Sequence, residues 1–451
     1  MTPTSRSPSP PACAHDALAT RLRRNRLERR DLLWLLGAGT VAAALPGCAA
    51  LPAGGAGEAQ ERQTDTQQAA WQFSQDLGAV QDDAVSDYIA QVGLALMARM
   101  PRQDLAYSGR VLNAHHDNAY TFPGGATGVT RGLLVDLQDE AELAALLGHE
   151  LGHVNARHAG PSPGQTPMAR AAATSLNAAA QNAAGSPPLG PGTQIGASAL
   201  LPGYSREQER LADALGQAGM AAAGYPASGM VQLQQRLVAR HRERPGLLET
   251  MFVSHPMSEE RLERSRERAE TLHAATLKAP ARRERFMDSI ASLRRIAPAI
   301  QACRNGELAM SRRAHAEAGE QFALALKTAP RDYAAHLRMA QCLQAQERPR
   351  EALAVAETAR AICPQEAQAH RLAAALHLGL REPGAALDAL EQHDRVLPGD
   401  PGVLFMKAVA LDGMGQGRRA AEHYARCLQV SRQGEAARFS AARLQSMGYT
   451  L

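Results

Sequence analysis

Two histidines and a glutamate in the segment AALLGHELGHVNARH, residues 144–158, have the types and spacing for metal-assisted hydrolysis. On a helix, His149 and His153 would present both imidazoles on one face, one turn apart, as two ligands of a tetrahedral zinc do. Glu150 could then take a proton from a water whose pKa the metal lowers to about 7. The predicted helix from about Asp139 to Arg157 is the context that this HExxH pattern requires. The alternative is that two histidines merely share a helix face.

A catalytic zinc needs a third protein ligand, and the segment YSREQERLADALG, residues 204–216, offers one. Glu209 and Asp213 are four residues apart on a second predicted helix, so both carboxylates would lie on one face. In the alternative interpretation this is a solvated acidic face, balanced by Arg206 and Arg210. The two segments together favour a zinc site.

An HExxH helix followed by a helix with the pattern E-x-x-A-D resembles the gluzincin metallopeptidases of the HtpX and CAAX-prenyl-protease type. This resemblance covers about residues 70–275. It implies that Glu209 is the third ligand of one Zn²⁺ per chain. It also implies that Asp213 orients a ligand histidine from behind the metal.

The segment DNAYTFPGGATGVTRGLL resembles the strand that precedes the zinc helix in this family. There an edge strand pairs with the extended backbone of the substrate. The resemblance assigns this substrate-binding part to Asn118 and to Gly125, Ala126, Thr127, Gly128 and Val129. The alternative is an ordinary hairpin in the core sheet.

The segment SHPMSEER resembles a His-Pro segment of the family, and it implies that His255 and Arg261 steady a tetrahedral oxyanion. His255 could instead be a fourth zinc ligand that closes the site, or a surface histidine in a turn before proline. The remaining nearby histidines have no partner at ligand spacing and are predicted to lie on the surface: His115, His116 and His158.

The composition favours a mainly α-helical protein. Aromatic residues make up only 4% of the chain, and abundant alanine favours helices packed through small residues. We expect an α+β zincin-type domain, with a zinc helix and a small sheet, at residues 70–298, followed by an α-solenoid. The net charge of +4 is too small and dispersed to indicate nucleic-acid binding.

The last third of the chain contains a 34-residue repeat. Pro330, Pro364 and Pro398 recur at this spacing, and an alanine stands twelve residues before each of them. The pattern resembles the tetratricopeptide repeat, with four units over residues 299–434 and a capping helix at 435–451. A chance alanine-rich helical bundle is the alternative.

Four cysteines in this region could form disulfides in an oxidising compartment, or be buried as small apolar side chains: Cys303, Cys342, Cys363 and Cys427.

The N-terminus reads as an export signal. An arginine-rich stretch precedes DLLWLLGAGTVAAALPGC, so residues 1–47 are predicted to form a signal peptide. Its last four residues, LPGC, resemble a bacterial lipobox, which implies that Cys48 is lipidated and becomes the first residue. Residues 48–69 would be a flexible tether, and Ala49 favours the outer membrane by analogy with bacterial sorting. An ordinary secretory signal without lipid is the alternative, and both general and twin-arginine export stay open. Past this signal no run of about 18 apolar residues occurs, so a multi-span membrane protein is excluded.

This layout resembles the BepA-type periplasmic protease-chaperones, with an N-terminus nearer to the LoiP-type lipoprotein peptidases. The resemblance implies a zinc endopeptidase of the bacterial cell envelope that acts on misfolded or unassembled proteins. Its repeats would bind clients or the outer-membrane assembly machinery. A scaffold or chaperone with a latent peptidase site is the alternative. Replacement of Glu150 by glutamine would distinguish the two, because only a protease needs that carboxylate.

Overall fold

The computed structural model describes residues 68–102, 104–158, 204–243, 251, 255–430, 432 and 434–450. The predicted signal peptide, Cys48 and the glycine- and proline-rich stretch at 160–203 lie outside these residues. Residues 68 and 69, which we assigned to the tether, belong instead to a helical segment at 68–75. None of the helices in the described part of the chain has the length and apolar character of a membrane-spanning segment.

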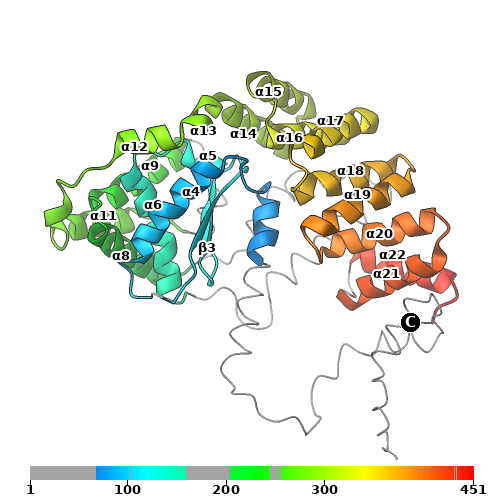
Figure 1. The fold of residues 1–451 in the computed structure, drawn as a ribbon, viewed down its shortest axis with the longest axis horizontal. Helices are drawn as coiled ribbons and strands as arrows, with labels where there is room; N and C mark the ends of the chain where they lie inside the picture. Colours follow the sequence, from blue (N-terminus) through cyan, green and yellow to red (C-terminus); the bar gives the residue numbers. More distant parts are fainter. Residues whose placement is uncertain are drawn as a thin grey trace, which may run out of the picture.

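The first half of the described chain is a small sheet with helices packed around it (Figure 1). Its longer helices are α4 (Asp83–Met97), α6 (Glu140–Asn155), α8 (Arg206–Ala222), α9 (Ser228–Glu243) and α11 (Glu259–Glu270). Shorter ones are α5 (Arg131–Leu134), η4 (Ala274–Thr276), α12 (Arg283–Ser289) and α13 (Ala291–Arg295). Helix α4 turns an apolar face toward the interior, where it buries Val85, Ile89, Val92 and Leu96.

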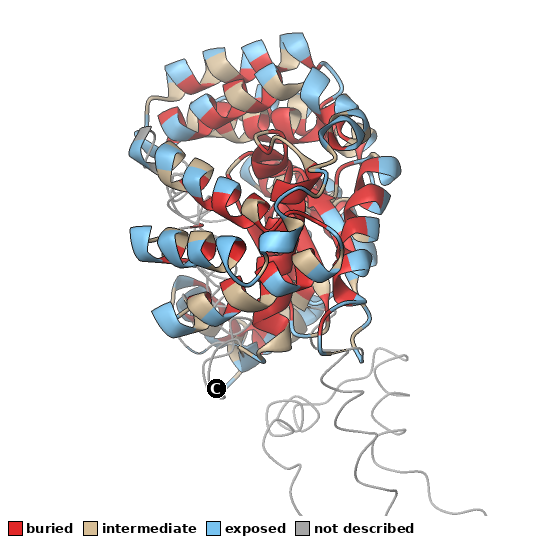
Figure 2. Cartoon of the chain, turned by 90° about the vertical axis from the view of Figure 1, so that its left-hand side faces the viewer, coloured by how far each residue is buried: buried red, intermediate tan, exposed pale blue. Residues whose placement is uncertain are grey.

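Helix α6 is the centre of this half and is buried along nearly its whole length, from Glu140 to Val154. Figure 2 shows buried residues concentrated in the interior and exposed ones on the outer helices. The Asp139 side chain caps the helix by accepting a hydrogen bond from the backbone of Glu142 at 2.9 Å. At the other end Arg157 takes a left-handed conformation with φ of 52°. The helix therefore lies within the predicted span, from about Asp139 to Arg157, and is slightly shorter at both ends.

The sheet has three strands in the order β1-β3-β2: β1 (Ser108–Leu112), β2 (Ala119–Thr121) and β3 (Ala126–Thr130). Strand β3 pairs in parallel with β1 and antiparallel with β2. The hairpin between β2 and β3 closes at Gly125, whose φ of 94° suits a residue without a side chain.

This strand order corrects one expectation from the sequence. The segment Gly125–Val129, assigned to substrate pairing, supplies the central strand, whose backbone groups are already bonded on both sides. The edge beside α6 is β2. Strand β3 ends at Thr130, where the chain turns into α5 at Arg131.

The second half is a helical array, defined here as α14 to α22. Its helices are α14 (Ala297–Ser311), α15 (His315–Thr328), α16 (Tyr333–Ala345), α17 (Pro349–Ile362), α18 (Ala367–Gly379), α19 (Pro383–Val396), α20 (Pro401–Gly413), α21 (Gly417–Val430) and α22 (Glu435–Ser446). In Figure 1 the array continues from α13 and curves around to the far side of the sheet.

Consecutive helices of the array pack in pairs, and the sequence repeat is visible in their contacts. Its alanines Ala318, Ala352, Ala386 and Ala420 are fully buried. The residue that joins the two helices of each pair has a positive φ of 59–73°, again 34 residues apart: Arg313, Glu347, Arg381 and Gly415. The assignment of these pairs to tetratricopeptide repeats stays a prediction. Cys303, Cys342, Cys363 and Cys427 are buried and free.

A buried ionic cluster joins the two halves. Arg131 of α5 donates two hydrogen bonds to Asp332, at 2.6 and 3.0 Å, across 201 residues of sequence. His115 lies between the Arg131 guanidinium, 2.7 Å from its Nε2, and Glu307, 3.0 Å from its Nδ1. The predicted surface position of His115 is therefore wrong, since it is fully buried. His116 is largely buried too, with Nε2 3.5 Å from Asp76. Docking of the array over this end of the sheet covers His115.

Candidate metal centre

Four side chains from three parts of the chain converge in the interior of the first half. His149 and His153 come from α6, Glu209 from α8, and His255 from the segment before α11. Their ligand atoms all lie within 4.8 Å of one another, and all four residues are buried. Nε2 of His149 is 3.1 Å from Nε2 of His153 and 3.2 Å from Nδ1 of His255. Oε1 of Glu209 is 3.1 Å from both His153 and His255.

These separations fit one tetrahedral zinc. Bonds of about 2.0–2.1 Å from zinc to nitrogen and oxygen place neighbouring donors of a tetrahedron about 3.4 Å apart. The donor set of three imidazoles and a carboxylate is also one that zinc takes. Burial lowers the pKa of His153 to about 3, so its imidazole is neutral, which is the form that binds metal. The predicted ligands His149, His153 and Glu209 thus meet as the sequence pattern requires.

Glycines bring the ligands of α6 and α8 together. A Cβ atom at Gly152 would lie 2.5 Å from the carbonyl oxygen of Ala212. One at Gly216 would lie 2.6 Å from the backbone carbon of Gly148. Only residues without side chains permit so close a crossing of two helix backbones. The crossing of the two helices therefore brings Glu209 of α8 next to the two histidines of α6.

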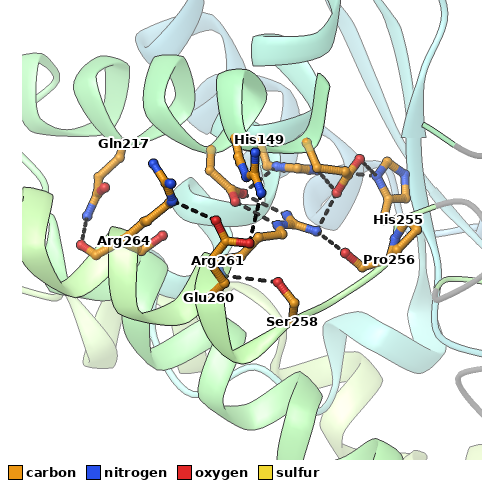
Figure 3. Close-up of polar contacts among 12 residues, drawn as sticks. His149, Gln217, His255, Pro256, Ser258, Glu260, Arg261 and Arg264 are labelled. Carbon is orange, nitrogen blue, oxygen red and sulfur yellow. Dashed lines mark hydrogen bonds and ion pairs between the residues drawn. The ribbon is translucent and has the colours of Figure 1, made fainter. Parts of the chain in front are cut away.

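Asp213 and Arg261 support the ligands from behind, and Figure 3 shows the Arg261 side chain reaching Pro256. Asp213 lies 2.9 Å from Nδ1 of His149, so that Nδ1 donates its hydrogen and Nε2 is left for a metal. Arg261 donates to both oxygens of Asp213, at 2.7 and 2.8 Å, and forms an ion pair with Glu209. Burial by itself raises the pKa of Asp213, but the Arg261 guanidinium outweighs it and lowers this pKa to about 2.

This arrangement corrects the expectation for Arg261. Its remaining contact is to the carbonyl oxygen of Pro256 at 2.9 Å, and the residue is only 4% exposed. Each guanidinium nitrogen already has an acceptor, so Arg261 orients Asp213 and Glu209 instead of meeting an oxyanion.

Glu150 faces the same cluster and has the environment of a proton acceptor. It is 2% exposed, and its Oε1 atom accepts no hydrogen bond from any residue that the structure describes. Burial raises the pKa of the carboxyl, against the opposing effect of His255 and His149. A carboxylate with a raised pKa takes a proton more readily. The backbone of Thr121, in edge strand β2, donates a hydrogen bond to it.

His255 is part of the cluster and not a surface residue. It is 3% exposed, and its Nε2 lies 3.7 Å from Oε1 of Glu150. Its position suits the fourth-ligand interpretation, because Nδ1 is as close to Glu209 and His149 as the ligands are to one another.

Two residues that contact the ligand His153 could not be predicted as such from the sequence. His158, predicted to lie on the surface, has Nδ1 3.0 Å from Nδ1 of His153. The Tyr204 ring stacks on the His153 imidazole, with centroids 3.7 Å apart and an interplanar angle of 23°. The pattern H-x-x-x-x-H at 153–158 could have drawn attention to His158, whereas nothing in the spacing indicates Tyr204.

Asn118, the other predicted substrate contact, directly precedes β2 and is 1% exposed. Both polar atoms of its amide lack a hydrogen-bond partner among the described residues. A buried amide without partners is costly, so this one is a candidate for binding a ligand.

Known proteins resemble the segment that carries these residues. Residues 83–269 match Peptidase family M48. A Vibrio cholerae protein described as a beta-barrel assembly-enhancing protease is 31% identical over 198 residues. The beta-barrel assembly-enhancing protease of Escherichia coli is 26% identical over 198 residues, and that of Yersinia pestis 26% over 197. Each match covers 42% of this chain and 40% of the relative. Residues 83–269 therefore resemble the M48 peptidases, which indicates a metallopeptidase domain around this cluster.

Proposed function

We propose that the chain is a zinc-dependent endopeptidase of the bacterial cell envelope that cleaves misfolded or unassembled proteins. The observation that carries this proposal is the convergence of His149, His153 and Glu209 beside the buried carboxylate of Glu150. A structural zinc site would not need a further buried carboxylate next to its ligands.

Zinc, held by His149, His153 and Glu209, would polarise the scissile carbonyl and lower the pKa of the attacking water. Glu150 accepts a proton from this water as its oxygen bonds to the carbonyl carbon. The same carboxyl then delivers that proton to the amide nitrogen as the carbon–nitrogen bond breaks. Asp213 and Arg261 hold His149 and Glu209 in place during both steps.

The substrate would lie along β2. The carbonyl of Asn118 accepts a backbone hydrogen bond from β3, and the N–H of Phe122 donates one to β3. The alternation of an antiparallel pair therefore turns the backbone groups of Ala119 and Thr121 outward. Thr121 is also the residue that contacts Glu150. An extended peptide that pairs with β2 would therefore pass beside the catalytic carboxylate, and Asn118 would add contacts from its amide. Unfolded or unassembled chains offer such extended segments over most of their length, whereas compact proteins do not.

The helical array would bind clients or an assembly partner. It is joined to the peptidase half through the buried ionic cluster, so a bound client would be held at a fixed position relative to the site. The names of the relatives concern β-barrel assembly, which supports envelope proteins as clients and a periplasmic location. Lipidation at Cys48 and attachment to the outer membrane belong to the same proposal.

Cleavage of an unfolded protein tests the proposal. Purified protein and its Glu150→Gln variant are incubated with casein, and the zinc content of both is determined. We expect one zinc per chain in each, cleavage by the wild type, and a loss of at least about 10³-fold in the variant, the scale of losing the general base. A wild type without zinc would refute the proposed site.

A second candidate is a chaperone or scaffold with a latent site, which the position of His255 specifically favours. As a fourth donor 3.1 Å from Glu209, His255 would fill the open position that catalysis needs. In that case the wild type holds zinc without cleaving casein, and His255→Ala gains activity. If both the wild type and His255→Ala bind zinc but neither cleaves casein, the function is that of a scaffold or chaperone.

A further inference from the structure

The end of helix α6 folds back onto the second metal ligand. The helix finishes at Asn155, and Arg157 adopts a left-handed conformation that would more usually be taken by glycine. This turn lets the backbone N–H of His158 donate to the carbonyl oxygen of His153 at 2.9 Å. The same bond brings the His158 side chain alongside the His153 ring.

The two imidazoles form a directed hydrogen bond. Their Nδ1 atoms are 3.0 Å apart, so one of them must carry the hydrogen. If Nε2 of His153 keeps its lone pair for a metal, Nδ1 of His153 is the donor and Nδ1 of His158 the acceptor. His158 then does for His153 what Asp213 does for His149.

Tyr204 holds the same ring by its face. Its ring is nearly parallel to the His153 imidazole, at 3.7 Å, whereas His255 and His149 meet His153 edge-on. The centroids of Tyr204 and His158 are 6.3 Å apart, so the two side chains restrain His153 from adjacent sides. With both in place the ring can neither flip nor tilt away from the other ligands.

We propose that His158 and Tyr204 are positioning residues that set the affinity of this chain for zinc through His153. The inference rests on the proposed zinc site, and its measurable quantity is metal affinity rather than turnover. Loss of an outer partner of a ligand histidine costs about 10–100-fold in metal affinity. His158→Ala should lose affinity within this range.

The test is a competition titration of zinc against a chromophoric chelator, with the metal-free protein and each variant. His158→Asn places an amide oxygen near the position of Nδ1, so it should recover most of the affinity lost in His158→Ala. Tyr204→Phe keeps the stacked ring and should bind zinc as the wild type does. Tyr204→Ala should bind more weakly.

His273→Ala is a matched control. The backbone N–H of His273 donates to the carbonyl oxygen of Arg268 at the end of α11, the same bond that His158 makes at the end of α6. Removal of this imidazole should leave zinc affinity unchanged. Equal affinities for wild type and His158→Ala, or a His158→Asn variant no better than His158→Ala, would overturn the role of His158. Equal affinities for wild type and Tyr204→Ala would overturn that of Tyr204. Wild-type protein that binds no zinc would instead refute the proposed function.

Discussion

Arg261 shows how a single side chain can belong to a metal site without touching the metal. Its fork engages both oxygens of Asp213, and its third nitrogen reaches Glu209 and the Pro256 carbonyl. It thereby supports one ligand directly and another through Asp213. Arginine suits this position because its planar fork matches a carboxylate, which an ammonium group cannot do.

We expect Arg261→Lys to weaken zinc binding by about 10–100-fold, as for other outer partners of ligands. Activity at saturating zinc should return close to that of the wild type, since every guanidinium nitrogen of Arg261 already has an acceptor within the protein. Zinc titration and casein cleavage at several zinc concentrations measure this. Arg264→Lys is the control, because Arg264 lies on the same helix and pairs with Glu260 in solvent. If added zinc fails to rescue Arg261→Lys, the arginine acts in the reaction itself.

The spacing of residues and the family resemblance were enough to find the ligands and Asp213, but not the residues that support His153. His149, Glu150 and His153 follow from helix periodicity, and Glu209 from a second helix with acids four residues apart. His158 and Tyr204 contact one ring although 45 residues separate them, so only the tertiary fold brings them together. The burial of His115 likewise depends on the docked array.

At the scale of elements, the crossing of α6 and α8 determines the geometry of the centre. Gly148 and Gly152 on one helix meet Gly216 and the backbone of Ala212 on the other. The glycines in HELGH and LADALG are therefore spacers that fix the distance between ligands on different helices. The sequence predicts both helices, but it does not show which of their glycines face each other.

Gly216→Ala should separate the two helices. The added methyl would meet the backbone of α6, which cannot move as a flexible side chain would, and we expect a loss of about 1–3 kcal/mol in the free energy of unfolding. Zinc affinity should fall with it, because Glu209 moves away from the histidines. Urea unfolding of the metal-free protein and zinc titration measure the two effects.

Gly384→Ala provides the comparison for this variant. Gly384 lies in the first turn of α19, and a Cβ atom there has open space around it. Alanine should leave zinc affinity unchanged and stabilise the helix by up to about 1 kcal/mol. A Gly216→Ala variant that behaves in the same way would show that the helices do not depend on glycine for their approach.

At the scale of the whole molecule, the two halves are joined by charges rather than by an apolar seam alone. Arg131 and Asp332 are both buried, and Asp332 also caps α16 through the backbone of Ala335 at 2.8 Å. Arg338 extends the cluster by pairing with Glu307 at 2.6 Å. Buried pairs of this kind are costly to break from one side, since the remaining charge has no solvent.

We expect Asp332→Asn to lower the free energy of unfolding by about 3–5 kcal/mol, because it keeps the helix cap but leaves Arg131 buried without a counter-charge. Adding Arg131→Met should restore much of this loss, since the second charge is then removed as well. Chemical denaturation of the four forms of the cycle measures the coupling. Strictly additive effects of the two substitutions would mean that the pair does not join the halves.

The pair also predicts how stability depends on pH. Burial raises the pKa of Asp332, but the Arg131 guanidinium outweighs burial and lowers this pKa to about 2, from 3.8 without these effects. A depressed carboxyl pKa stabilises the folded state above pH 3.8, and this contribution is lost as the pH falls toward 2. The difference in stability between wild type and Asp332→Asn should therefore shrink over this interval. A difference that stays constant down to pH 2 would contradict the assignment.

The contact of His158 and Tyr204 with one imidazole has a consequence for how this chain can vary. The described backbone leaves the metal centre at His158 and returns at Tyr204, where the two rings are 6.3 Å apart. Any segment inserted between them begins and ends at these fixed, neighbouring points. The geometry of the metal ligands therefore does not depend on the length of the inserted segment. Doubling the length of such an insertion adds only about 0.6 kcal/mol of closure entropy. Segments of different length could therefore join His158 to Tyr204 without a change in the geometry of the ligands.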